Sequence, residues 1–316
     1  MTNIKSLDPI ELSSDESFAL RPPDTMSSMV WRRFRRHPGA VVGFVVLSII
    51  VVAVSLAFLS PYDPLKSDIK NRVQPPSLEH PFGTDQLGRD YLTRVLYGGR
   101  VSLFVGVMVV IIILIIGVPV GMAAGYFGGW IDDVLTRIID AFLALPSLLV
   151  LILLSAILRE IEFPLLEKNS VMTIAIVIGI LAWMTVARLV RAIFLSLREM
   201  EYVTAARALG ATSLLIMFAE ILPNGFGPII VEATLEIGFA IMEESGLSFL
   251  GFGIMPPTPS WGNLLGGAVE HLTTHPWLAI FPGLMIFFTI ISINYIGDGL
   301  RDALDPYKML SKIEEK

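Results

Sequence analysis

The sequence predicts an all-α, polytopic membrane protein with six transmembrane helices. Hydrophobic residues make up 54% of the 316 residues, charged residues 16%, and the mean hydropathy is +0.70. Soluble domains carry roughly a quarter charged residues, so this chain is too apolar for a soluble surface. Long apolar stretches recur along the chain, and about 20 such residues are enough to span a bilayer.

The chain opens with a polar segment that ends in four arginines. Residues 1–38 contain two adjacent prolines and serine-rich patches, and we expect a partly flexible tail. Arginines within 32–36 precede the uncharged stretch 39–60, which is the first predicted span. The positive-inside rule then places the N-terminus in the cytoplasm. A cleaved signal peptide is the alternative, but the apolar run begins late and has no good cleavage site.

Five further apolar stretches predict the remaining spans. They cover about 101–125, 138–158, 171–190, 225–250 and 277–297. Pro119 and Pro146 lie inside two of them, and proline usually bends a membrane helix. We expect a short cytoplasmic turn at 126–137 and outer loops at 159–170 and 251–276. Most Lys and Arg residues then fall on the inner side, which places both termini in the cytoplasm.

The predicted outer segment 61–100 is polar and rich in proline and glycine. Glycines suggest turns around a short helix at Tyr91–Leu96. Asp85, Arg89, Asp90 and Arg94 are spaced to pair across that helix. We assign these charges a structural role.

The stretch 201–223, between the fourth and fifth spans, is the main candidate for a docking site. Ala205 and Ala206 favour a helix with little bulk, Gly210 is a natural helix terminator, and Thr212 or Ser213 can cap a second helix. We expect Ile221-Leu222-Pro223 to end that second helix, because proline lacks the amide donor and restricts its neighbour. Small side chains on an exposed helix let another protein approach closely. The alternative is an ordinary loop helix with a glycine stop.

This stretch resembles the EAA loop of ATP-binding-cassette (ABC) importer permeases. Ala205-Ala206, Gly210 and Pro223 have the spacing of that loop, which in the family is the coupling helix that docks on the ATPase. Thr204 stands where the family usually carries glutamate. The resemblance makes these residues the candidate ATPase-coupling set: Glu201, Thr204, Ala205, Ala206, Gly210, Leu222 and Pro223.

Further motifs narrow the resemblance to the DppC/OppC-like permeases of dipeptide and oligopeptide importers. They are HPFGTDQLGRDYLTRVLYGGRVSL, EESGLSFLGFGIMPPTPSWGN and IGDGLRDALDP, in the family's order. The resemblance implies a type I ABC importer permease (MetI-like) fold in the bacterial or archaeal plasma membrane. It also implies four kinds of partner: a second homologous permease, two ABC ATPase subunits, an extracytoplasmic substrate-binding protein and a peptide substrate. Relatives in this family also carry glutathione or nickel complexes.

The predicted domains follow from the spans and the resemblance. Residues 1–38 form the cytoplasmic tail, and 39–100 hold the first span and an extracytoplasmic segment that resembles the OppC N-terminal region. Residues 101–300 form the five-helix permease domain, which contains the coupling loop 201–223. Residues 301–316 form a second cytoplasmic tail.

The fifth span contains four acids, Glu232, Glu236, Glu243 and Glu244. An acid near a span centre costs roughly 2.5–3.5 kcal/mol on insertion scales, so these side chains should not face lipid. At about 100° per residue, the first three fall within about 40° of one another, and Glu244 lies off that face. We interpret them as lining a translocation path or a partner interface. The alternative places Glu232 at the inner water boundary and Glu243 and Glu244 at the outer one.

Other chemistries find little support in the sequence. There is no phosphate loop, nucleophile elbow or H-E-x-x-H motif, so we expect no enzyme and no cofactor, with ATP hydrolysis on partner subunits. His271 and His275 have zinc-compatible spacing but few further ligands, and we predict no metal site. The absence of a basic stripe argues against nucleic acid. An ion-coupled secondary transporter, a membrane-embedded enzyme and a structural scaffold remain the alternative classes.

Overall fold

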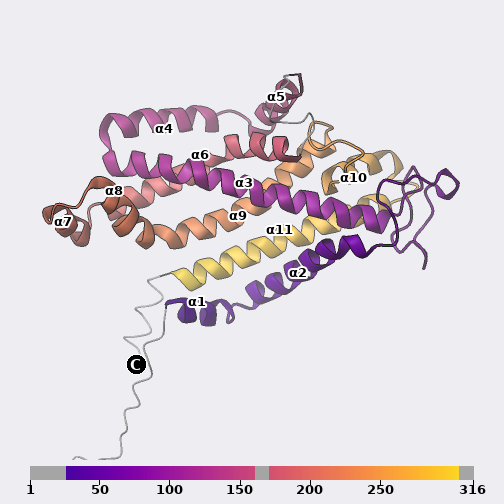
Figure 1. Cartoon of the computed structure of the whole chain (residues 1–316), viewed down its shortest axis with the longest axis horizontal. Coiled ribbons are helices and arrows are strands. Elements are labelled where there is room, and N and C mark those ends of the chain that lie inside the picture. Colours follow the sequence, from indigo (N-terminus) through magenta and orange to yellow (C-terminus); the bar gives the residue numbers. More distant parts are fainter. Residues whose placement is uncertain (1–25, 161–170, 306–316) are drawn as a thin grey trace, which may run out of the picture.

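The structure is a computed structural model that describes residues 26–160 and 171–305, and its described part is almost wholly helical (Figure 1). The helices are α1 (Met26–Phe34), α2 (Pro38–Ser55), α3 (Tyr91–Phe127), α4 (Gly129–Leu143), α5 (Ser147–Glu160), α6 (Val171–Leu197), α7 (Glu201–Ala208), α8 (Ser213–Leu215), α9 (Leu222–Phe249), α10 (Trp261–Ala268) and α11 (Trp277–Leu304). Short 3₁₀ turns are η1 (Leu56–Leu59), η2 (Ile69–Asn71) and η4 (Val269–His271), and η3 (Ile216–Ile221) is a π-helical turn.

Five helices of the described chain are long and apolar enough to cross a membrane. They are α2 with η1, α3, α6, the continuous run from α8 to α9, and α11. They contain the predicted first, second, fourth, fifth and sixth spans, and most extend beyond the predicted bounds because their polar ends are helical too. The all-α polytopic fold is therefore confirmed.

The third predicted span differs in shape from the expectation. Instead of one straight helix at 138–158, α4 and α5 meet at an angle of 89°, and only the bent pair taken together counts as a sixth span. The break falls at Pro146, which has no amide donor and restricts the residue before it. The predicted turn at 126–137 is also wrong, because Gly128 and Gly129, both at positive φ, reverse the chain within two residues.

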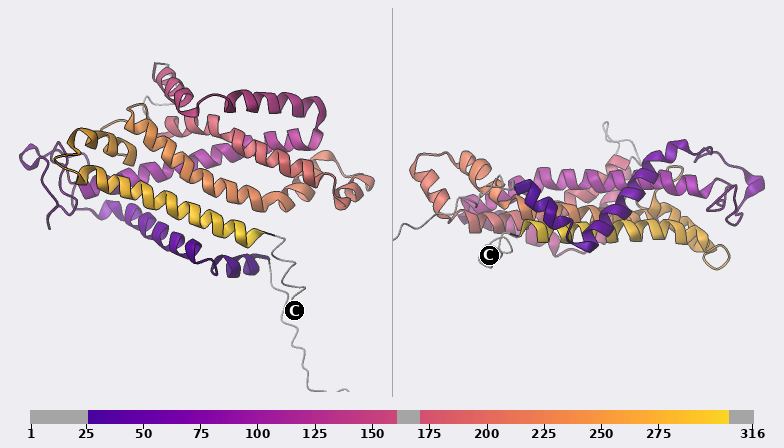
Figure 2. Two further views of the ribbon diagram at one scale, coloured as in Figure 1. Left: turned by 180° about the vertical axis from the view of Figure 1, so that it is seen from behind. Right: turned by 90° about the horizontal axis from the view of Figure 1, so that it is seen from below.

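The long helices form a bundle in which α3, α6 and α9 lie together and α2 packs along α11 (Figures 1 and 2). The most extensive contact is between α3 and α6. Gly117, Gly121 and Gly125 form a stripe on α3 that faces the backbone of α6, and a Cβ at Gly117 would lie 2.7 Å from the Trp183 carbonyl. Small residues along such a stripe let the backbones of two membrane helices approach each other closely.

The bundle has two ends with different loops (Figure 1). We call them the α7 end, which holds α1, α7, α8 and the last turns of α11, and the α10 end, which holds α10 and residues 60–90. Within the predicted tail 1–38, residues 26–34 form helix α1 at the α7 end, and residues 1–25 lie outside the described chain. Likewise, the loop predicted at 251–276 contains α10 at the opposite end.

At the α10 end the predicted short helix at Tyr91–Leu96 proves to be the first turns of α3. Asp90 caps it by accepting from the Thr93 amide at 2.8 Å. Gly98 and Gly99 do not break the helix because they admit α10, and a Cβ at Gly99 would lie 2.7 Å from the Trp261 ring. Asp85 pairs with Arg89 and Arg94 as predicted, whereas Asp90 instead binds His80, at 2.8 Å.

Candidate functional site

The candidate docking stretch projects from the bundle at the α7 end (Figure 1). It consists of α7, a turn around Gly210, α8 and the π-helical turn η3 that leads into α9. We call residues 201–218, which end within η3, the knob. Gly210 has φ of +86°, a conformation that side chains with a Cβ rarely adopt, and nothing lies within 4 Å of the place where a Cβ would be.

Backbone hydrogen bonds fix the turn of the knob. The Ala211 amide donates to the Ala206 carbonyl and the Gly210 amide to the Arg207 carbonyl, both at 3.1 Å, the pattern of a glycine-terminated helix. Thr212 then caps α8 by accepting from the Leu215 amide at 3.3 Å. The predicted helix, glycine bend and second helix are therefore all present in the structure.

The knob rests on a few buried side chains and exposes many apolar ones. Val203 is fully buried and Ala206 packs on the core, as do Ile216 and Met217 at its far end. In contrast, Leu209 is 89% exposed, and the other exposed apolar side chains of the knob are Tyr202, Leu214, Leu215 and Phe218. An exposed apolar surface of this kind is typical of a contact with another protein or with a membrane.

The candidate coupling residues occupy both faces of the knob. Glu201, Thr204 and Ala205 are exposed, whereas Ala206 is half-buried. The Thr204 hydroxyl donates to the Met200 carbonyl of its own helix at 3.4 Å. Because threonine is uncharged, this position offers no charge to an approaching partner. Burial, followed by the charge of Glu220, raises the pKa of the Tyr202 phenol.

The prediction that Ile221-Leu222-Pro223 ends the second helix is wrong. The run from Ser213 to Phe249 is continuous, and Pro223 lies in the first turn of α9. Its missing amide is tolerated there because the π-helical turn η3 widens the hydrogen-bond spacing just before it. The knob is thus joined to α9 by helix rather than by a flexible loop.

The four acids of α9 occupy different environments. Glu236 is 7% exposed, and Glu232 and Glu243 are half-buried. No hydrogen bond or ion pair to Glu236 forms within residues 26–160 and 171–305. These three acids are the ones predicted to share a face, and their role in a path or interface stays a prediction.

Glu244 is fully buried at the junction of α3, α9 and α10. It accepts from the Ser102 hydroxyl at 2.8 Å and from the Ser248 hydroxyl at 2.7 Å. The two serines in turn accept from backbone amides, Ser102 from Trp261 at 3.2 Å and Ser248 from Ile254 at 2.9 Å. The carboxylate therefore ties α10 and the loop before it to the bundle.

Sequence reasoning missed a cluster of charges where α3, α4 and α6 meet. Asp132 on α4 binds Arg191 on α6 in a bidentate pair, and the second of its contacts is 2.7 Å. Arg198, three residues before α7, donates to the Gly125 carbonyl at 3.0 Å. Acids and arginines are visible in the sequences of both segments, but the turn predicted at 126–137 gave no reason to expect them to pair.

Metal-ligating side chains do not gather within the described ranges. No group of three His, Asp or Glu residues there could hold a metal ion. His271 and His275 stack edge to face, 5.7 Å between ring centroids, and His80 is engaged with Asp90.

Fold and knob together define a multi-pass helical membrane protein with one protruding helical turn at the α7 end. The family described as binding-protein-dependent transport system inner membrane components matches residues 117–308, and the N-terminal transmembrane domain of oligopeptide transport permease C matches residues 25–76. The chain belongs to this family of transport permeases.

Curated relatives cover nearly the whole chain. A dipeptide transport system permease protein of Alkalihalophilus pseudofirmus is 43% identical over 293 residues, 90% of this chain and 93% of its own length. An oligopeptide transport system permease protein of Bacillus subtilis is 40% identical over 275 residues, 87% of each chain. A glutathione transport system permease protein of Pectobacterium atrosepticum is 38% identical over 278 residues, 87% of this chain and 89% of its own. A solved chain of the MetNI methionine ABC transporter is 16% identical, with a TM-score of 0.48 over 67% of this chain and 96% of its own.

Proposed function

We propose that this protein is a permease subunit of an ATP-driven importer for dipeptides and oligopeptides. In this proposal it lines the translocation path with a second, homologous permease, and ATPase subunits and an extracytoplasmic binding protein complete the assembly. The observation that carries it is the knob, a rigid protrusion with an exposed apolar surface joined by continuous helix to α9.

The knob then faces the cytoplasm. Arg32, Arg35 and Arg36 lie at the α7 end and are exposed, and the positive-inside rule assigns such a cluster to the cytoplasmic side. Both termini of the described chain lie at that end too. The α10 end accordingly faces outward, where a binding protein delivers its cargo.

Continuity between the knob and α9 suggests how ATP hydrolysis moves the path. A push on α7 passes through buried Val203, Ile216 and Ile221 to α9 without crossing a flexible loop. Because α9 carries Glu232, Glu236 and Glu243, its displacement moves these acids relative to the neighbouring permease. We assign them to the path, where a carboxylate suits the amino terminus of a peptide, and the protein alternates between inward- and outward-facing states.

Substitution of Gly210 tests the coupling role. In Gly210→Val a branched side chain must adopt positive φ, which costs about 1–2 kcal/mol, so the turn changes shape although no neighbour is hit. We expect peptide uptake to fall at least tenfold while subunit assembly stays normal, measured as labelled-peptide transport in proteoliposomes. Normal uptake in this variant would contradict the proposal.

Two controls separate coupling from general strain. Gly210→Asn retains much activity, because asparagine tolerates positive φ. Gly251 has φ of +82° at the α10 end, so Gly251→Val imposes a similar backbone strain away from the knob. Equal losses in Gly210→Val and Gly251→Val would show that strain alone matters.

The energy source and cargo need their own measurement. Uptake by the reconstituted complex should stop without ATP and persist when ion gradients are collapsed. The reverse result would favour an ion-coupled transporter. Peptides of graded length, with glutathione included because of its permease relative, then define the cargo.

A further inference from the structure

An apolar groove lies at the α7 end, between α1, α2 and α11. It encloses about 470 Å³. Its lining is apolar and aromatic throughout: Val30, Trp31, Phe34, Phe44, Ile296, Leu300 and Leu304. This volume is in the range of pockets that bind small molecules or single acyl chains.

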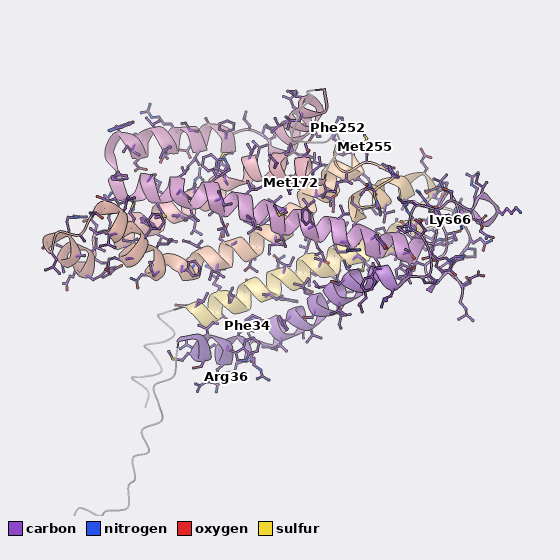
Figure 3. All side chains as sticks on the ribbon, viewed as in Figure 1. Phe34, Arg36, Lys66, Met172, Phe252 and Met255 are labelled. Atoms are coloured by element: carbon purple, nitrogen blue, oxygen red, sulfur yellow. The ribbon has the colours of Figure 1, made fainter. Side chains whose placement is uncertain are left out.

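Aromatic side chains that line the groove contact one another. Trp31 stacks on Phe34 with 6.0 Å between ring centroids, and Phe34 meets Phe44 edge to face at 6.5 Å. Phe34 is 8% exposed, whereas Trp31 is 53% exposed at the entrance. Figure 3 shows Phe34 between α1 and the end of α11, and Arg36 at the rim of the bundle. The groove is therefore apolar inside, and basic residues lie on the segment that follows α1.

One arginine, Arg35, lies beside the aromatic side chain at the entrance of the groove. The Arg35 guanidinium lies 5.9 Å from the centroid of the Trp31 ring, and Arg35 and Arg36 are both exposed. Within the described chain Arg36 forms no ion pair. Arg33 points elsewhere, toward the Asp305 carbonyl at 3.5 Å.

Among the described residues around the groove, the charge is positive even when the neighbouring acids are included. The last turns of α11 carry Asp298, Asp302 and Arg301, and Asp305 follows the end of the helix. Four arginines of the α1 segment and Arg301 outnumber these three acids. An apolar groove with basic residues near it, beside the first residues of a membrane span, matches the chemistry of an anionic lipid.

We propose that this groove binds one anionic phospholipid from the leaflet at the α7 end. One acyl chain lies against Phe34, Phe44 and Ile296, and the phosphate headgroup lies against Arg35 and Arg36. The lipid fixes α1 along α2 and α11 at the membrane surface. This site lies away from both the knob and the acids of α9, so it does not depend on their assignment.

Lipid labelling tests the site. The full-length chain is placed in nanodiscs of equal phosphatidylglycerol and phosphatidylcholine, with a trace of either lipid carrying a photoreactive acyl chain. Labelled peptides are then identified by mass spectrometry. We expect phosphatidylglycerol to label α1, α2 and the end of α11 several-fold more than phosphatidylcholine does.

Two variants separate headgroup from acyl-chain binding. Arg35→Gln with Arg36→Gln removes most of this several-fold preference for phosphatidylglycerol, because arginines near the membrane surface attract anionic lipid. Lys66→Gln with Lys70→Gln removes the same charge from exposed residues at the α10 end and leaves the preference unchanged. Leu300→Trp fills the groove and lowers labelling by both lipids. If the double arginine variant does not fold, Arg36→Gln alone serves.

Other occupants give different results. A photoreactive amino acid at Leu300 should crosslink mainly to lipid. Crosslinks to residues 1–25, to residues 306–316 or to another polypeptide would overturn the proposal. So would lipid labelling that neither the arginine variants nor Leu300→Trp change.

Discussion

The two ends of the bundle hold their loops by different means. At the α10 end, Asp85, Asp90 and Glu244 are each less than 5% exposed, and each accepts hydrogen bonds from more than one group. At the α7 end, backbone bonds and buried Val203 shape the knob, and Leu209 is 89% exposed. Buried carboxylates specify one arrangement of a loop, whereas an exposed apolar turn leaves its surface for a partner.

The largest expected effect is at Asp85. It accepts from Arg89 Nε at 2.7 Å and from the Leu87 and Arg89 amides, and it lies 3.2 Å from Arg94 Nε. Asp85→Ala leaves the charge of Arg94, 3% exposed, without its acid, and we expect a loss of about 3–5 kcal/mol in the free energy of unfolding. Denaturation in mixed micelles measures this loss. Asp63→Ala, an exposed acid in the same segment, is the control, and equal losses would contradict the comparison.

Glu244→Ala should give the next largest effect. It removes the shared acceptor of the buried hydroxyls of Ser102 and Ser248, which costs about 2 kcal/mol. We expect faster hydrogen exchange in α10 and in residues 250–260, while α7 and α8 exchange as before. Glu270→Ala, at an exposed acid beside α10, should leave exchange unchanged. Uniform acceleration across both ends would show that Glu244 does not act locally.

The pair of Asp132 and Arg191 should contribute less, because both side chains are partly exposed. A double-mutant cycle with alanine at each position should give a coupling energy of about 1 kcal/mol in unfolding experiments. Asp140 and Arg188 join the same two helices, but their side chains are more than half exposed. Their coupling energy should be near zero, and a larger value than that of the first pair would contradict this ranking.

Leu209→Ser should have the smallest effect on stability and a clear effect on docking. The Leu209 side chain is almost entirely exposed to solvent, so we expect the free energy of unfolding to change by no more than about 0.5 kcal/mol. ATPase subunits should nevertheless co-purify less with this variant than with the unchanged chain. Leu78→Ser, at a fully exposed leucine of the α10 end, provides the matched control. Undiminished co-purification of the ATPases would argue against the knob as their docking site.

Much of the fold was predictable because the signals are local. Apolar length located α2, α3, α6, α9 and α11, and Gly210 with Thr212 correctly predicted the bend of the knob. Errors arose where one type of residue can have two structural roles. Pro146 does break a helix, whereas Pro223 sits harmlessly in a first turn behind a π-helical turn. Gly98 and Gly99 look like turn residues, but they serve the contact between α3 and α10.

The same distinction applies to the candidate site: its local features were predictable from the sequence, and its contacts between distant segments were not. Sequence spacing grouped Glu232, Glu236 and Glu243 and set Glu244 apart, but it did not show that Ser102, distant in the chain, binds Glu244. His80 and Asp90 were likewise both visible without any sign that they pair. Such partners depend on how helices are placed side by side, and periodicity within one segment carries no information on that.

The sequence by itself determined the class of the protein, the positions of its long helices, the charge asymmetry of its ends and the small-sided bend of the knob. Each of these follows from the composition or the backbone preferences of a single stretch. Only the tertiary structure decided the bend between α4 and α5, the continuity of the knob with α9 and the partners of the buried carboxylates. It also decided that α1 closes an apolar groove with α2 and α11. The reason is physical: a buried charge or an apolar groove is defined by atoms from several helices, and their packing determines which atoms meet.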